Sequence, residues 1–497
     1  MNSKIVKANI ALSIVHQMVS ITCGFIIPRI LLAAFGSETN GLISSISQFL
    51  NYVTLLEGGV IGVSTAALYK PLHENNKEKV NDVVNAIRRY FNRLGLLCIA
   101  FTVIVAMAYP RYVNTRYSYS YIFLLTIVLG SRLIVQYCVS ISYRILLNAD
   151  QKVYYVSIVY IIITVVHLLL VFVSVRITDD VLTVYFISGL IYLIQPLFYI
   201  VYVNKHYELD RKAEYKSDSL AQKWDGFGQN LAYFIHTNTD VVLLTIFSTF
   251  TNISIYSIYL LVANALKGFI ITVSSAVAPT IGNILADEDT EKSNYYFEKY
   301  EFVIVLISFL FYTCGIQLVV PFVSIYTKGI SDANYIQPVF GTILLLAEMA
   351  YCIRDPYVSV AYASGHFRQT SKYAFAEALG NIVISIFLVQ SMGLVGVAIG
   401  TFVSMSIRAV QHVLYLKDNI LYRNPALFIK KTFIYGFVSL IMISMARMII
   451  PYRMESFVQW IGYAFLAFIV TAVAFSIVNA IFYKREFADL IKRIINR

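Results

Sequence analysis

Residues 151–175 read QKVYYVSIVYIIITVVHLLLVFVSV, and after Lys152 this stretch carries no charged side chain. A helix that crosses the hydrocarbon core of a bilayer needs about 20 predominantly apolar residues, and this run supplies them. We therefore expect a transmembrane helix here. Runs of the same kind recur along the whole chain.

The composition agrees with that pattern, because 58% of the 497 residues are hydrophobic and only 13% are charged. These values exclude an ordinary soluble domain. Dividing the sequence at its long apolar runs predicts about fourteen transmembrane helices, at 9–33, 40–66, 90–110, 119–147, 151–175, 180–204, 226–249, 253–285, 300–326, 334–363, 372–391, 393–416, 431–450 and 456–483. We therefore expect an all-α integral membrane protein.

Positive charge is distributed unevenly between the loops. Most of the 39 lysines and arginines fall in alternate loops, which are long, whereas the loops of the opposite side are very short. By the positive-inside rule the basic loops and both termini face the cytoplasm. The net charge of +11 then reflects membrane topology and attraction to anionic headgroups, and we expect no nucleic-acid partner.

Two basic segments have the apolar periodicity of helices that lie on a membrane surface. In 78–93 the apolar residues recur at helical spacing beside Arg88, Arg89 and Arg93, and the tail 484–497 shows the same pattern. Such helices bury an apolar face among headgroups and present basic residues to anionic lipid. A solvated stop signal that only fixes topology is the alternative.

A weak internal repeat predicts two similar halves. Three short matches recur in the same order, displaced by about 210 residues: FGSETN at 35–40 with FSTFTN at 247–252, VSTA at 63–66 with VSSA at 273–276, and Glu78-Lys79 with Glu291-Lys292. An even number of spans separates the copies, so the halves have the same orientation in the membrane. We expect two pseudo-symmetric six-helix lobes around a central cavity, as in an alternating-access transporter, plus two C-terminal helices. The predicted divisions are 1–215, 216–425 and 426–497.

Several longer stretches resemble a known family. They are LYKPLHENNKEKVNDVVNAIRR at 68–89, APTIGNILA at 278–286, RDPYVSVAYASGHFRQTSKYAFAEALGNIVIS at 354–385 and GLVGVAIGTFVS at 393–404. In order and spacing they are similar to the polysaccharide-transporter (Wzx-type O-antigen and capsule flippase) branch of the multidrug/oligosaccharidyl-lipid/polysaccharide flippase superfamily. The resemblance implies a two-lobed bundle in the inner membrane of a bacterium or archaeon. It also implies translocation of undecaprenyl-diphosphate-linked oligosaccharide from the inner to the outer leaflet, in concert with other polysaccharide-assembly proteins.

Cations inside the spans are the first candidates for a binding site, because charge in hydrocarbon is costly. Cations inside the predicted spans include Arg29, Arg132, Lys267, Arg354, Arg408 and Arg447. Arg132, Lys267 and Arg354 lie deep, Arg29 follows Pro28 nearer the outer third, and the last two lie near span ends where snorkelling explains them. We predict that the first four bind the diphosphate in the cavity, the arginines through their forked donors. Structural pairing with carboxylates is the alternative, most of all for Arg354.

Acidic residues inside the spans are candidates for ion coupling. Glu57 precedes Gly58-Gly59, and Asp240 lies in the middle of its span. Either could exchange a proton or a sodium ion and so use an ion gradient, or could pair with a deep arginine. Glu377 is expected to hold helices together.

Other classes of function remain as alternatives. A multidrug or cation extruder and a lipid II flippase belong to the same superfamily. A polytopic polysaccharide polymerase is less favoured, since no outer loop is long enough for a catalytic site. No GxxxxGK[ST] sequence is present, and the five cysteines stand singly. We therefore expect no enzyme activity, no cofactor and no metal site.

Overall fold

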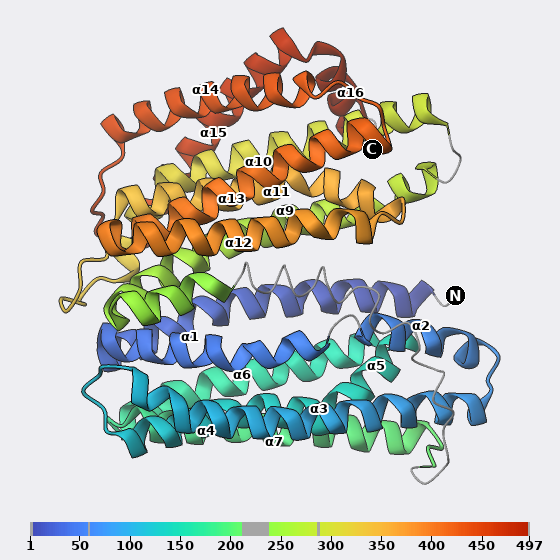
Figure 1. Ribbon diagram of the computed structural model, residues 1–497, viewed down its shortest axis with the longest axis vertical. Helices are drawn as coiled ribbons and strands as arrows, with labels where there is room; N and C mark the ends of the chain where they lie inside the picture. Colours follow the sequence, from blue (N-terminus) through green and yellow to red (C-terminus); the bar gives the residue numbers. More distant parts are fainter. Residues whose placement is uncertain (1–2, 58–59, 211–237, 286–288, 496–497) are drawn as a thin grey trace. The chain divides into compact units, whose positions relative to one another are not determined.

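The computed structural model describes residues 3–57, 60–210, 238–285 and 289–495, and every element in these ranges is helical. The chain divides into two compact units, Met1–Phe234 and Ile235–Arg497 (Figure 1). The all-α class expected from the sequence is confirmed. The domain boundaries expected after residues 215 and 425 stay predictions.

The first unit is a bundle of long helices, in which α1 packs against α6, α3 against α4, and α7 against both α4 and α6. Its elements in chain order are α1 (Ser3–Asn51), the 3₁₀ helix η1 (Tyr52–Glu57), α2 (Val60–His73), α3 (Lys77–Tyr112), α4 (Tyr119–Val135), the π-helix η2 (Gln136–Ser140), α5 (Ile141–Ala149), α6 (Val153–Ile177) and α7 (Val181–His206).

The second unit begins with a short apolar helix, Asn238–Phe247. The helices α9 (Phe250–Leu285), α10 (Thr290–Tyr326), α11 (Pro338–Ala363), α12 (Phe367–Met392), α13 (Leu394–Asn419), α14 (Ala426–Ile449), α15 (Phe457–Phe482) and α16 (Lys484–Ile495) follow. Of these, α9, α11, α12 and α13 pack side by side, and α14 and α15 pack on α10. The expected helix in the tail is confirmed as α16; its place on a membrane surface stays a prediction.

Eleven helices in the described ranges are long and apolar enough to cross a membrane, against about fourteen expected. The first two expected spans are joined in the long α1, and most of the expected span 226–249 lies outside the described residues. The third difference is α11. It has the length of a span but is not among the eleven, because it carries Glu348, Arg354 and Asp355. The expected number of helices is therefore approximately right, and the protein is a multi-pass membrane protein.

The first match of the internal repeat coincides with a helix break in each unit. Gly36 has φ 80° and ψ 177° and divides α1 into two helical parts; glycine adopts such a positive φ without the strain that a Cβ would cause. In the second unit the helix Asn238–Phe247 ends, and α9 begins at Phe250, within the matching segment.

The third match marks the same helix start in both units. The Asn76 side chain accepts a hydrogen bond of 3.0 Å from the backbone N–H of Lys79 at the start of α3. The Asp289 carboxylate accepts one of 3.0 Å from the N–H of Lys292 at the start of α10. Each is an N-cap that satisfies an otherwise unpaired helical N–H.

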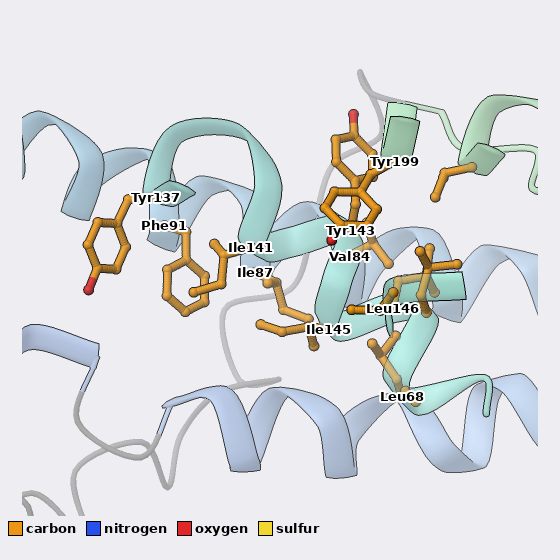
Figure 2. Close-up of a cluster of buried hydrophobic side chains, with 14 of the residues drawn as sticks. Leu68, Val84, Ile87, Phe91, Tyr137, Ile141, Tyr143, Ile145, Leu146 and Tyr199 are labelled. Atoms are coloured by element: carbon orange, nitrogen blue, oxygen red, sulfur yellow. The ribbon is translucent and has the colours of Figure 1, made fainter. Parts of the chain in front are cut away.

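The segment 78–93 does not form a separate surface helix, so that expectation was wrong. It is the N-terminal part of α3, and its apolar residues, Val80, Val83, Val84, Ile87 and Phe91, belong to the buried core of the first unit. Figure 2 shows several of them facing residues of α2, η2, α5 and α7. The apolar face is covered by protein, because burial against other helices satisfies the same periodicity as burial among headgroups.

The connection that leaves α7 is fixed to α3. Asn85 Nδ2 donates to the Asp210 carbonyl at 2.8 Å, and Asn81 Nδ2 donates to the Glu208 carbonyl at 3.1 Å. The Lys77 ammonium hydrogen-bonds the Glu208 carboxylate at 2.7 Å and lowers the pKa of that carboxyl. Residues 207–210 therefore belong structurally to the first unit.

Candidate functional site

The first unit contains a cavity of about 660 Å³. Residues of α1, η1, α4, η2, α6 and α7 form its wall. Several of them carry hydrogen-bonding side chains, among them Ser47, Asn51, Thr54, Gln136, Thr164 and His167. A polar wall within apolar helices can bind a ligand that presents hydroxyl groups or charge.

Arg132 is the cation of this cavity, and its side chain is exposed there. Its guanidinium carbon lies 4.2 Å from the centre of the Tyr192 ring, and His167 packs against the same ring with 5.1 Å between centroids. Among the described residues, no carboxylate forms an ion pair with Arg132. Its donors therefore remain available to an anionic ligand, which a guanidinium binds through two parallel hydrogen bonds.

Arg29 is next in sequence to a residue that lines this cavity, but it does not itself form part of the wall. The neighbouring Pro28 lines the cavity, whereas Arg29 is half-buried in α1. The structure thus places Arg132, a predicted site residue, in the wall of this cavity.

Glu57 ends η1, and its carboxylate accepts a hydrogen bond of 2.5 Å from the Tyr137 hydroxyl of η2. Arg144 of α5 also interacts electrostatically with this carboxylate. Arg144 was not among the predicted site residues, although it lies within the expected span 119–147. A second arginine inside the same apolar stretch as Arg132 was the available signal.

The deep cations of the second unit are paired with carboxylates. Lys267 Nζ of α9 lies 2.9 Å from Glu348 Oε2 of α11, and both side chains are largely buried. The Tyr351 ring lies under two cations, with its centroid 5.3 Å from Lys267 Nζ and 4.7 Å from the Arg354 guanidinium carbon.

Arg354 belongs to a buried network of three charged residues. Its Nη1 lies 3.1 Å from Glu377 Oε1 and 3.2 Å from Oε2, and Arg408 Nη1 also donates to Glu377 Oε2. All three residues are at most 4% exposed. The expectation that Arg408 snorkels to an interface is therefore wrong, because the Glu377 carboxylate of α12 binds its guanidinium inside the bundle.

Asp240 lies among hydroxyl and amide groups from three other helices. Tyr256 OH and Thr401 Oγ1 donate to Asp240 Oδ2 at 2.9 and 2.8 Å, and Asn381 Nδ2 donates to Oδ1 at 3.2 Å. Ser385 Oγ donates to Asn381 Oδ1 at 2.9 Å. Asp240 is buried, with 3% of its surface exposed, and its carboxylate accepts hydrogen bonds from two hydroxyl groups and one carboxamide.

Among known proteins, no family model and no curated sequence matches this chain. Solved structures do match. The lipid II flippase MurJ, in an inward closed conformation, has a TM-score of 0.76 and 16% sequence identity, and the match covers 97% of this chain and 100% of that one. An inward-facing multidrug resistance MATE family transporter of the MOP superfamily has a TM-score of 0.64 and 13% identity, covering 87% of this chain and 96% of that one.

The MATE multidrug transporter DinF-BH has a TM-score of 0.61 and 13% identity, covering 85% of this chain and 98% of its own. At these identities the similarity establishes the fold. The chain has the all-helical fold that these flippases and multidrug transporters share, and it extends over nearly their whole length.

Proposed function

We propose that this protein is a flippase that moves undecaprenyl-diphosphate-linked oligosaccharide from the inner to the outer leaflet of a prokaryotic inner membrane by alternating access. The protein would act as a carrier and not as an enzyme, with both termini in the cytoplasm. The fold supports this proposal, since the similar structures are transporters.

One observation carries the choice of an anionic substrate: Arg132 is exposed in a cavity and has no carboxylate partner among the described residues. An unpaired guanidinium within a membrane protein is costly unless a ligand or water satisfies it. A diphosphate is the complementary group, because its own transfer through hydrocarbon is prohibitive without paired cations. The same arginine would repel a cationic substrate, which argues against an extruder of cations.

The size of the cavity limits how much of the substrate it could hold. Its volume of about 660 Å³ falls within the ~300–1,000 Å³ typical of pockets for small ligands. That space suits a diphosphate with its first sugars, whose hydroxyls would bind to the polar wall. The rest of the glycan and the polyprenyl tail would lie outside it.

The paired cations of the second unit suggest a different division of roles. We propose that Arg354 orients α11, α12 and α13 through Glu377, and that Lys267 reaches substrate only when it separates from Glu348. A buried guanidinium that already has a carboxylate gains little from a second anion and would leave the first unpaired.

Asp240 is the better candidate for ion coupling. A carboxylate among two hydroxyls and a carboxamide offers the oxygen ligands that hard cations prefer, and a proton could bind at the same oxygens. Glu57 is the second candidate, with Tyr137 as its hydrogen-bond partner. Binding of the ion would favour one conformation of the carrier and so couple transport to a gradient.

A lipid II flippase is the second candidate function. The similarity to MurJ over 97% of the chain favours it, and it requires the same recognition of a diphosphate. The two substrates share the polyprenyl diphosphate and differ in the glycan, so an arginine that binds diphosphate does not distinguish the two candidate functions.

Gene disruption separates these functions. Loss of the protein should cause a lipid-linked glycan to accumulate on the cytoplasmic face, and the identity of that glycan names the substrate. Complementation with Arg132→Ala should fail at normal protein level, whereas Arg93→Ala, which removes an exposed arginine of α3, should complement. Accumulation of a drug or cation inside the cell, with no trapped glycan, would contradict the proposal.

A further inference from the structure

A π-helical turn separates α4 from α5. In η2, residues Gln136–Ser140, the backbone N–H of Ile141 donates to the carbonyl of Gln136, five residues earlier. A regular α-helix bonds residues four apart, so this turn contains one extra residue. Such turns are rare and are frequent at functional sites.

The extra residue changes which side chains share a face. Arg144 follows Arg132 by twelve residues, which in a regular α-helix would place the two side chains about 120° apart around the axis. With one residue taken up by the π-turn the spacing behaves as eleven, and the angle falls to about 20°. The two arginines therefore lie on nearly one face, about 16 Å apart along the axis.

The surroundings of the two arginines agree with this alignment. Arg132 lies beside Tyr192, against which His167 of α6 packs. The guanidinium carbon of Arg144 lies 5.1 Å from the centre of the ring of Tyr160, also in α6. Tyr160 precedes His167 by seven residues, nearly two full helical turns, so both face the same side of α6.

Arg144 is incompletely satisfied where it lies. Its Nε is buried without a hydrogen-bond partner, and so is Oδ1 of Asn148, one turn further along α5. Among the described residues no carboxylate forms an ion pair with Arg144. Its guanidinium lies over the Tyr160 ring and interacts electrostatically with Glu57 and with His16, Tyr137 and Tyr199. Buried donors without acceptors are costly, and an anionic ligand would supply the acceptors.

We propose that Arg144 forms a second anion site, through which the diphosphate headgroup passes before it reaches Arg132. This inference rests on the proposed function. A separation of about 16 Å is too long for one diphosphate to bridge, so the two sites act in sequence. With the proposed orientation Arg144 lies on the cytoplasmic side of Arg132, because α5 ends at an inner loop.

The experiment measures binding kinetics on the full-length protein in lipid nanodiscs, with farnesyl diphosphate as a water-soluble probe. Surface plasmon resonance gives the association rate and Kd. Arg132→Ala should raise Kd about tenfold or more, since it removes a charge-assisted contact of the final site. Arg144→Ala should slow association and dissociation alike, by about tenfold, with Kd nearly unchanged, because it alters the path and not the end state. Arg144→Lys should keep most of the rate.

Two further variants separate an anion site from a structural role. Arg93→Ala controls for removal of an exposed arginine, and Glu57→Gln/Arg144→Gln keeps the local charge balanced. If Arg144 only neutralises Glu57, the double variant regains the wild-type rate, and this overturns the second site. An association rate in Arg144→Ala equal to that of Arg93→Ala overturns it too. A wild-type protein that does not bind the probe overturns the proposed function itself.

Discussion

Glu377 of α12 accepts two hydrogen bonds from Arg354 Nη1 of α11, at 3.1 and 3.2 Å, inside the second unit. The same carboxylate also binds Arg408 of α13. One acidic side chain thus links three helices that are consecutive in the chain. The ion pair is inaccessible to ligands, and this distinguishes Arg354 from Arg132.

Neutralising Glu377 should destabilise the protein strongly. Glu377→Gln removes the ion-pair partner that two buried guanidinium groups share, which is expected to cost about 3–5 kcal/mol. Thermal unfolding of the purified protein in detergent measures the change. Glu74→Gln is the matched control, because its pair with Lys70 is exposed and contributes less than about 1 kcal/mol. Equal melting temperatures for the two variants would contradict the role of Glu377.

The ring of Tyr192 should matter more than its hydroxyl. A cation over an aromatic face gains about 0.5–2 kcal/mol, so Tyr192→Leu should weaken transport roughly 2- to 30-fold by letting Arg132 move, and Tyr192→Phe should keep most of it. Flipping of a lipid-linked substrate in proteoliposomes measures both. A Phe variant as poor as the Leu variant would assign the effect to the hydroxyl.

The oxygen ligands around Asp240 should set the ion dependence of transport. Asp240→Asn removes the charge, and transport should no longer respond to a sodium or proton gradient. Thr401→Val removes one donor to that carboxylate and should shift the ion concentration for half-maximal transport. Thr313→Val is the control, since its hydroxyl bonds Ser439 of α14, away from the Asp240 carboxylate. Unchanged ion dependence in Asp240→Asn would transfer the role to Glu57.

The close approach of α12 and α13 should not tolerate a larger residue. A Cβ on Gly400 would overlap Ser385 Oγ and lie 3.0 Å from the Ser385 backbone nitrogen, so Gly400→Ala should destabilise by about 1–3 kcal/mol. Gly436→Ala in α14 meets no atom within 4 Å and should be neutral or stabilising by up to about 1 kcal/mol. Melting temperatures of the two variants check the contrast, and the opposite order would refute it.

Much of the fold follows from local properties of the sequence. Apolar runs of bilayer length define most helices, and the break at Gly36 falls between two predicted spans. The segment 78–93 shows where this reasoning fails, since its apolar periodicity is the same whether lipid or the buried residues Ile145 and Leu146 cover it. Periodicity identifies a buried face and not what buries it.

The candidate site was only partly predictable. Arg132 was identified because a deep cation in an apolar run is costly wherever it lies. Arg144 was missed, since its alignment with Arg132 depends on a π-turn that a count of 3.6 residues per turn cannot reveal.

The sequence by itself determined that the chain is helical, spans a membrane many times and carries costly charge inside it, because hydropathy acts on each segment separately. Only the tertiary structure decided which charges are paired. Lys267 pairs with Glu348 and Arg354 with Glu377, each from another helix. Arg132 instead lines a cavity. Ion pairing acts over a few ångströms between segments distant in the chain, and helix packing alone brings those segments together.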